Sequence, residues 1–254
     1  MLILGWIAKL INMLPMRSRK ALLFFYLFVI ASIIHVAAEA LSVFWLAAST
    51  KTLPLALLFI SFYLEVSTRS RFKGYILSGL LFSLLGDLLL LLARLNETYF
   101  LLGLSSFLVA HIFYIMAFSG YARQHPPGYV QTVPWAILPF AVYVVGLSLW
   151  WWGDLGGLRL PVVAYSLVIT AMGISALNLR NAAPLPVFLT LLAGAIFFIL
   201  SDTMIAVEKF KVSIPLSRIW IMATYFLAQG CIAWASAALA SRLVAVVDAP
   251  DGHR

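Results

Sequence analysis

The chain has 254 residues, of which 64% are hydrophobic and only 10% are charged, and its mean hydropathy is +1.04. Soluble domains contain roughly 45–50% apolar and about 25% charged residues, so this composition excludes a soluble protein and predicts an integral membrane protein. The formal net charge of +8 does not indicate nucleic-acid binding, because the Lys and Arg residues fall in short loops between apolar stretches, where membrane topology accounts for them.

The first 15 residues differ from the rest of the chain. Gly5, Lys9 and Asn12 recur at helical spacing among apolar residues, which predicts a helix lying in the membrane interface. A signal peptide is the alternative, and it fits less well because Arg17, Arg19 and Lys20 follow the apolar stretch instead of preceding it. We therefore expect an N-terminal interfacial segment over residues 1–20.

Eight apolar stretches follow this segment. A helix that crosses a hydrocarbon core of roughly 30 Å needs about 20 apolar residues. The predicted spans are 21–47, 53–67, 74–93, 98–121, 131–152, 158–179, 185–207 and 213–241. The sequence therefore predicts an all-α integral membrane protein with one eight-helix transmembrane domain over 21–241 and a C-terminal tail over 242–254.

The distribution of basic residues predicts the orientation of these spans. With the N-terminus inside, 11 of the 17 Lys and Arg residues fall on the inner side and 6 on the outer side. Basic residues favour the cytoplasmic side of a membrane. We therefore expect both termini in the cytoplasm and a location in the bacterial inner (cell) membrane.

Two acidic residues lie inside apolar stretches in nearly identical settings. Asp87 and Asp202 each end the pattern G-x-x-F-x-x-x-[G/S]-D, in segments 79–92 and 194–207. A carboxylate in hydrocarbon costs at least about 2.5–3.5 kcal/mol, so the sequence assigns both residues to function; the alternative is a helix-bundle ion pair. The matched segments favour two parallel four-helix repeats, which would place both aspartates at the same depth in the outer half; the alternative is chance similarity.

Other polar residues lie within the predicted spans at i,i+3 or i,i+4 spacing, so that each pair shares one helix face. These pairs predict that polar groups from five spans point into one intramembrane cavity. A His or Tyr in a membrane helix also commonly serves as an interhelical hydrogen bond, and Glu39 could pair with His35 or Lys51. The pairs are His35 with Glu39, His111 with Tyr114, and Tyr225 with Gln229, and Ser83 lies one turn before Asp87.

Several kinds of chemistry have no support in the sequence. It contains no G-x-S-x-G or H-E-x-x-H motif and no glycine-rich phosphate loop. The single cysteine, Cys231, excludes a disulfide framework and a Cys-rich metal motif, and too few histidines lie in spans for a three-His zinc site. What remains is a pair of carboxyl groups with His and Tyr in an apolar setting, a combination that supports acid–base chemistry on a lipid.

Four segments resemble the YhhN family of membrane proteins, which includes the lysoplasmalogenases. The segment around Asp87 is similar to the first acidic motif of the family, and 103–118 carries its H-x-x-Y pattern at His111 and Tyr114. The segment 160–176 matches a Pro-Tyr-Met pattern at Pro161, Tyr165 and Met172, and 194–210 with 224–230 matches the second acidic motif and the terminal helix. The early Lys-Pro feature appears with its residues spaced apart, as Lys51 and Pro54. The resemblance covers roughly 50–235.

The resemblance implies a hydrolase that cleaves the vinyl ether of a lysoplasmalogen to a fatty aldehyde and a glycerophospho-alcohol, with no metal or organic cofactor. For this reaction we expect Asp87 and Asp202 to face one cavity, where one protonates the alkenyl carbon and the other activates water, and which residue has which role stays open. The implied partners are a lysophospholipid substrate and membrane lipids, with headgroup preference and oligomeric state open. The expected substrate-binding residues are His111, Tyr114, Tyr225, Gln229, Glu39, Lys51, Tyr165, Ser83 and Ser201.

Two other classes of function remain open from the sequence. A small transporter or lipid-binding membrane protein would also use buried acidic residues and parallel repeats around a midplane site. A scaffold or assembly factor would account for the apolar helices but not for the matched aspartates. Release of a fatty aldehyde without any gradient distinguishes the hydrolase from the transporter.

Overall fold

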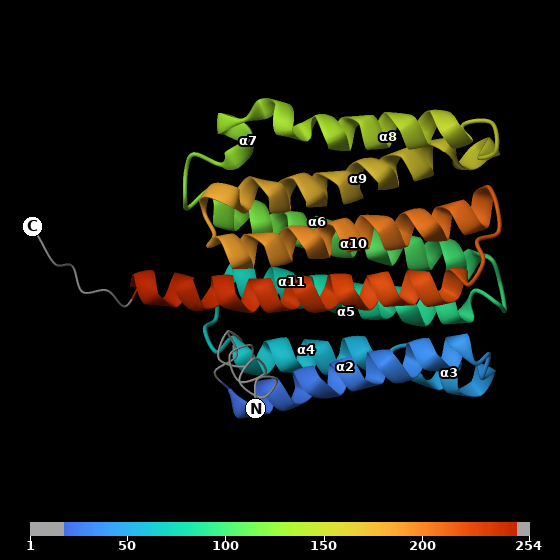
Figure 1. The fold of residues 1–254 in the computed structure, drawn as a ribbon, viewed down its shortest axis with the longest axis horizontal. Helices are drawn as coiled ribbons and strands as arrows, with labels where there is room; N and C mark the ends of the chain where they lie inside the picture. Colours follow the sequence, from blue (N-terminus) through green and yellow to red (C-terminus); the bar gives the residue numbers. More distant parts are fainter. Residues whose placement is uncertain (1–17, 248–254) are drawn as a thin grey trace, which may run out of the picture.

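A computed structural model describes residues 18–247, and every regular element in this range is a helix (Figure 1). The first half contains α2 (Arg19–Ala40), α3 (Phe44–Thr50), α4 (Leu53–Glu65), α5 (Arg71–Leu92) and α6 (Thr98–Ala122). The second half contains α7 (Tyr129–Thr132), η1 (Pro134–Ile137), α8 (Leu138–Trp151), η2 (Gly156–Leu158), α9 (Arg159–Leu177), η3 (Asn178–Asn181), α10 (Leu185–Phe210) and α11 (Ser217–Val247).

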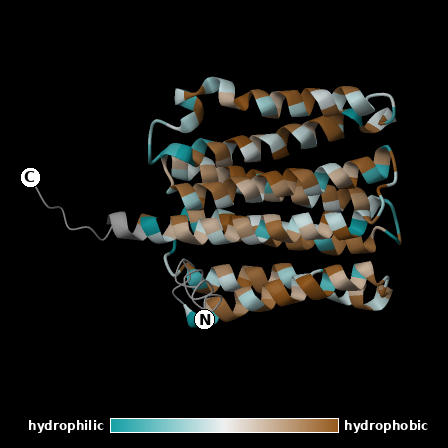
Figure 2. Cartoon of the chain, in the orientation of Figure 1, coloured by the Kyte–Doolittle hydropathy of each residue, from teal (hydrophilic) through white to brown (hydrophobic). Residues whose placement is uncertain are grey.

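Within residues 18–247, eight helical stretches are long and apolar enough to cross a membrane, and the protein is an integral membrane protein. Figure 2 shows hydrophobic residues along the length of the helices and more hydrophilic residues toward their ends. The spans are Arg19–Ala40, Phe44–Glu65, Arg71–Leu92, Thr98–Ala122, Pro134–Trp151, Gly156–Asn181, Leu185–Phe210 and Ser217–Leu243. The predicted all-helical membrane fold is therefore confirmed within residues 18–247, whereas the repeat stays a prediction.

The predicted first span, 21–47, was wrong at its end. Helix α2 stops at Ala40, and α3 instead joins α4 to form the second span. The backbone N–H of Val43 donates to the Ala38 carbonyl at 2.9 Å, and Ser42 adopts a left-handed conformation with φ of 57°. This arrangement is a Schellman-type helix end, in which the left-handed residue is usually glycine. Because a serine occupies that position here, the sequence contains no local signal for the turn.

The predicted terminal segments lie partly within residues 18–247. Of the interfacial segment expected over 1–20, residues 1–17 lie outside the described residues, and Ser18 caps the N-terminus of α2 through its side chain. Helix α11 continues into the expected tail as far as Val247, and the remainder lies outside the described residues.

The helices run side by side in a stack of layers (Figure 1). Helix α5 packs along α6, α10 along α11, and α2 along α4, while α8 packs mainly on α9 at one edge. Small residues allow close contact between these helices: a Cβ at Gly194 of α10 would lie 3.0 Å from the Ala228 carbonyl of α11. Four helices, α5, α6, α10 and α11, therefore form the centre of the protein, and they carry both Asp87 and Asp202.

Candidate active site

The two aspartates line one cavity. This cavity has a volume of about 520 Å³ and lies where the C-terminal ends of α2, α5 and α10 meet α3 and the N-terminal end of α11. The Asp87 residue is 2% exposed and the Asp202 side chain is 8% exposed. The two carboxyl groups are close enough to interact electrostatically. Helices that are far apart in sequence thus bring both aspartates to the same partly enclosed cavity.

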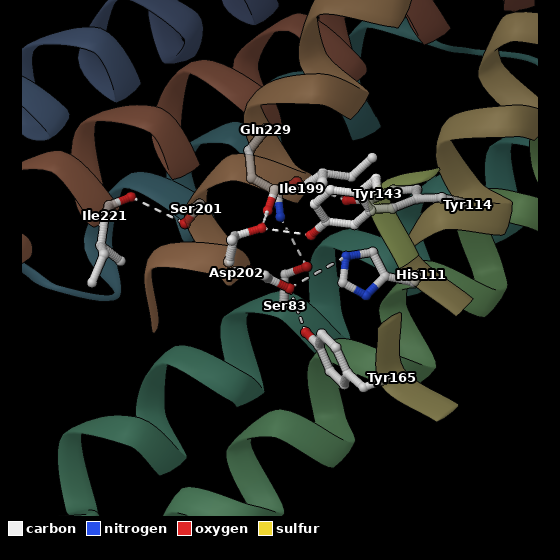
Figure 3. Close-up of polar contacts among 11 residues, drawn as sticks. Ser83, His111, Tyr114, Tyr143, Tyr165, Ile199, Ser201, Asp202, Ile221 and Gln229 are labelled. Atoms are coloured by element: carbon white, nitrogen blue, oxygen red, sulfur yellow. Dashed lines mark hydrogen bonds and ion pairs between the residues drawn. The ribbon is translucent and has the colours of Figure 1, made fainter. Parts of the chain in front are cut away.

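Each aspartate accepts a hydrogen bond from a tyrosine of a neighbouring helix. The Tyr225 hydroxyl on α11 donates to Asp87 Oδ2 at 2.8 Å, and the Tyr165 hydroxyl on α9 donates to Asp202 Oδ2. Figure 3 shows the Tyr165 contact with Asp202. A hydrogen-bonded carboxyl group keeps a defined orientation, so both tyrosines fix the direction in which the aspartates face the cavity.

His111 on α6 lies beside the Asp202 carboxyl group. Its Nε2 is 3.8 Å from Asp202 Oδ2, and the residue is fully buried (Figure 3). The Phe107 carbonyl is one turn earlier on the same helix, but within residues 18–247 neither ring nitrogen meets hydrogen-bond geometry with any partner. The imidazole also packs against Phe198, with ring centroids 4.5 Å apart. It therefore retains hydrogen-bonding capacity directly beside one of the two carboxyl groups.

Three of the predicted substrate-binding residues form a separate buried network. The Tyr114 hydroxyl donates to Gln229 Oε1 at 2.7 Å, and Gln229 Nε2 donates to Ser83 Oγ at 2.9 Å (Figure 3). All three are fully buried, and none belongs to the lining of the two cavities described here. The network joins α5, α6 and α11. Because Ser83 and Gln229 lie one turn from Asp87 and Tyr225, it holds the helices that carry that pair.

The remaining predicted residues lie at different places around the cavity. Ser201, Glu39 and Lys51 all line it. Ser201 Oγ donates to the Ile221 carbonyl at 3.1 Å, which joins α10 to α11. Glu39 Oε2 is 3.9 Å from an Arg218 guanidinium nitrogen. His35 does not reach the cavity lining; its Nδ1 lies 3.1 Å from the Thr50 hydroxyl.

A second cavity of about 370 Å³ adjoins the first. Its lining is mostly apolar and comes mainly from α6, α8, α9 and α10, with Leu104, Leu108 and Ile169 among the contributors. Asp202, Phe107 and Ile205 border both cavities. The site therefore combines a polar compartment with an apolar one, and the Asp202 carboxyl group lies at the boundary between them.

Sequence reasoning missed two charged residues and the apolar cavity. Arg94 and Arg218 line the polar cavity, just after α5 and in the first turn of α11. Both residues lie at the ends of spans nearest the aspartates, and this position could have indicated in the sequence that they belong to the site. The apolar cavity had no signal, because its lining side chains are indistinguishable in sequence from those that face lipid. Within residues 18–247, no three His, Cys, Asp or Glu side chains gather into a group that could hold a metal ion.

The Tyr114 network makes a testable contribution to stability. Tyr114→Phe removes the donor to Gln229 and leaves a buried amide oxygen unpaired, so we expect the free energy of unfolding to fall by about 1–2 kcal/mol. Thermal unfolding in detergent measures this effect as a lower melting temperature. Thr190→Ala is the control, because Thr190 is only partly buried and its side chain bonds to a carbonyl of its own helix. Equal melting temperatures for the two variants would show that the network is not stabilising.

The fold and the site together define a polytopic membrane protein with two buried carboxyl groups at one cavity. The chain belongs to the YhhN family, whose family model matches residues 46–236. The resemblance expected from the sequence motifs is thereby confirmed.

Several curated proteins are similar to this chain. Lysoplasmalogenase TMEM86A of Homo sapiens is 30% identical over 210 residues, which cover 74% of this chain and 77% of that protein. A lysoplasmalogenase of Mycobacterium tuberculosis (strain CDC 1551 / Oshkosh) is 34% identical over 142 residues, covering 55% of this chain and 51% of that protein. Lysoplasmalogenase TMEM86B of Sus scrofa is 31% identical over 185 residues, covering 73% of each. No solved structure matches the chain.

Proposed function

We propose that this protein is a membrane hydrolase of the lysoplasmalogenase kind, which cleaves the vinyl ether of a lysophospholipid to a fatty aldehyde and a glycerophospho-alcohol. The similar proteins named lysoplasmalogenase support this class of activity. The observation that carries the proposal is the placement of Asp87 and Asp202 on one polar cavity, with Asp202 also bordering an apolar cavity. A single-chain ether lipid has one polar and one apolar part, and the two compartments match them.

The proposed reaction uses the two carboxyl groups in sequence. A protonated carboxyl donates its proton to the β-carbon of the vinyl ether, which leaves an oxocarbenium ion stabilised by nearby negative charge. The second carboxyl group, as a carboxylate, removes a proton from water while the water oxygen bonds to the cationic carbon, giving a hemiacetal. Collapse of the hemiacetal breaks the carbon–oxygen bond to glycerol and transfers the hydroxyl proton to the departing oxygen. This division of labour resembles that of the two carboxyl groups in glycosidases.

The positions of the two aspartates assign their roles in this proposal. The β-carbon lies on the alkyl-chain side of the vinyl ether, so its proton comes from Asp202, which borders the apolar cavity. Asp87 borders only the polar cavity, which Lys51 also lines, and a cation in the same cavity favours the ionised form of a carboxyl group. Asp87 therefore activates water. Tyr165 and His111 position Asp202, and Tyr225 positions Asp87.

Purified protein in detergent tests the proposed activity directly. With a lysoplasmalogen as substrate, we expect fatty aldehyde and glycerophospho-alcohol in equal amounts without any ion gradient. The matched control is a lysophospholipid with a saturated alkyl ether, which has no carbon that accepts a proton in this way and should remain intact. Absence of aldehyde, together with uptake of the lipid into sealed vesicles that contain the protein, would favour a transporter instead.

The apolar cavity makes a second prediction about the substrate chain. Ala206 lies one turn after Asp202 on α10 and lines this cavity, so Ala206→Phe fills part of the space assigned to the alkenyl chain. We expect kcat/KM to fall by roughly tenfold or more for long-chain substrates and less for short-chain ones. Val142→Phe on the exposed surface of α8 is the control for added bulk. Equal losses for long and short chains would contradict the assignment of this cavity.

A further inference from the structure

Three cations gather at the polar cavity. Lys51 lies between α3 and α4, Arg94 follows the last turn of α5, and Arg218 lies in the first turn of α11. Arg94 and Arg218 are both close enough to Lys51 to repel its positive charge. Glu39 and Asp87 are the acidic groups that attract Lys51, and they do so without an ion pair within 4.0 Å. The lining of this partly enclosed cavity therefore holds three cations together with the carboxyl groups of Glu39, Asp87 and Asp202.

The hydrogen-bonding groups of these cations are largely uncommitted. In the part of the chain that the structure describes, Lys51 Nζ has no hydrogen-bond or ion-pair partner. The Arg94 guanidinium stacks over the Phe44 ring at 4.4 Å, a contact that leaves its N–H edges available. Arg218 forms an ion pair with Glu39 through one guanidinium nitrogen at 3.9 Å, beyond hydrogen-bond distance, and its side chain is 69% exposed. Three sets of N–H donors therefore remain available at one cavity.

The other basic residues at this end of the protein are engaged elsewhere. Lys209 Nζ donates to Glu97 Oε1 at 2.6 Å, which holds the pKa of the Glu97 carboxyl below its usual value. Lys211 pairs with Asp154, and the Arg159 Nε donates to the Trp152 carbonyl at 2.8 Å. None of these three lines the polar cavity. The available donors are thus concentrated at the cavity and are not a general property of this end of the helices.

We propose that Lys51, Arg94 and Arg218 form a phosphate-binding subsite that holds the phosphodiester of a lysophospholipid. Lysine and arginine are the usual ligands of phosphate in proteins, and arginine offers paired N–H donors that match two phosphate oxygens. Only three glycerol carbons and one oxygen separate the ether oxygen from phosphorus, so the phosphate and the reacting bond must lie in the same cavity. The identity of the anion as a lipid phosphodiester rests on the proposed hydrolase function; the cation cluster itself does not.

The subsite also defines where each part of the substrate lies along the site. The phosphate lies among the three cations, the vinyl ether lies beside the aspartates, and the chain enters the apolar cavity past Asp202. The cations lie at the end of the helices that the distribution of basic residues assigns to the outer side. The lysophospholipid therefore enters from the leaflet opposite the side that carries the N-terminus of α2.

Binding of a lipid that cannot be hydrolysed tests the subsite without relying on catalysis. The probe is 1-O-hexadecyl-lysophosphatidylcholine, and the neutral comparison is 1-O-hexadecylglycerol, which has the same chain and no phosphate. We expect Lys51→Met, Arg94→Gln and Arg218→Gln each to weaken binding of the phospholipid by at least about tenfold in detergent titrations and to leave binding of the neutral lipid unchanged. Lys211→Met removes a cation at the same end of the protein and should change neither affinity.

The outcomes separate the subsite from the proposed reaction. Unchanged phospholipid affinity in all three variants, or equal losses for both lipids, would overturn the subsite. Binding of inorganic phosphate and of glycerophosphocholine is measured in the same way. If inorganic phosphate bound as tightly as the lysophospholipid, the assignment of the anion as a lipid would be overturned. If the expected binding pattern holds but no lysoplasmalogen is cleaved, the subsite stands and the hydrolase proposal fails.

Discussion

Asp202→Asn should reduce the release of fatty aldehyde by about 10²–10⁴-fold, the range that a positioned general acid contributes to catalysis. Asparagine has nearly the same shape as aspartate and still accepts the hydrogen bond from Tyr165, but it cannot donate a proton to carbon. The expected loss therefore falls on kcat, and substrate affinity should change little because the chain cavity keeps its shape. Aldehyde release by purified protein in detergent, measured over a range of lysoplasmalogen concentrations, separates the two parameters.

The control for Asp202→Asn is the same substitution at a carboxyl group outside the site. Asp154 lies beyond both cavities and pairs with Lys211, so Asp154→Asn should retain normal turnover. Membrane insertion and melting temperature of the two variants should match, because within residues 18–247 Asp202 forms no ion pair with a Lys or Arg. Near-normal turnover by Asp202→Asn would remove this residue from the proposed mechanism.

Asp87→Asn should reduce the release of fatty aldehyde by a similar factor, but at a different step of the reaction. In the proposed mechanism Asp87 activates water, so protonation of the vinyl ether by Asp202 remains possible without it. An anionic nucleophile needs no base, and sodium azide should therefore restore consumption of the substrate by Asp87→Asn. It should not restore consumption by Asp202→Asn, in which no acid is available for the first step. Mass spectrometry of the remaining lipid measures consumption whatever product forms.

The azide experiment discriminates between the two roles of the carboxyl groups. Restoration in Asp202→Asn and not in Asp87→Asn would reverse the assignment while keeping the pair. Restoration in neither variant would show that Asp87 does not act as the water-activating base. Glu97→Gln serves as the control, since Glu97 lies outside both cavities and its partner, Lys209, does as well.

Much of the fold could be predicted from the sequence because the signals are local. Length and apolarity identify a span, and the eight stretches found in the chain correspond to eight helical stretches in the structure. The failures occurred where a local signal was missing. The turn after Ala40 uses Ser42 in a left-handed conformation that glycine usually adopts, so nothing in the sequence separated α2 from α3.

The candidate site was predictable in part, since a carboxyl group in an apolar helix is costly and its presence needs a reason. Asp87 and Asp202 are visible in sequence for that reason, and the YhhN resemblance follows from the motifs around them. The sequence did not indicate which residue forms a hydrogen bond with each aspartate. Tyr225 bonds to Asp87 across 138 residues, and Tyr165 bonds to Asp202 across 37.

The sequence alone therefore determined the membrane-spanning character of this protein, its family and the two aspartates that the proposed chemistry uses. The tertiary structure decided that both carboxyl groups line one cavity, that Tyr114, Gln229 and Ser83 form a separate network, and that three cations share the polar compartment. The physical reason is how much of the chain each property depends on. The cost of burying a charge in hydrocarbon is a property of one residue in its own helix, whereas a cavity exists only through the packing of helices that are distant in the chain.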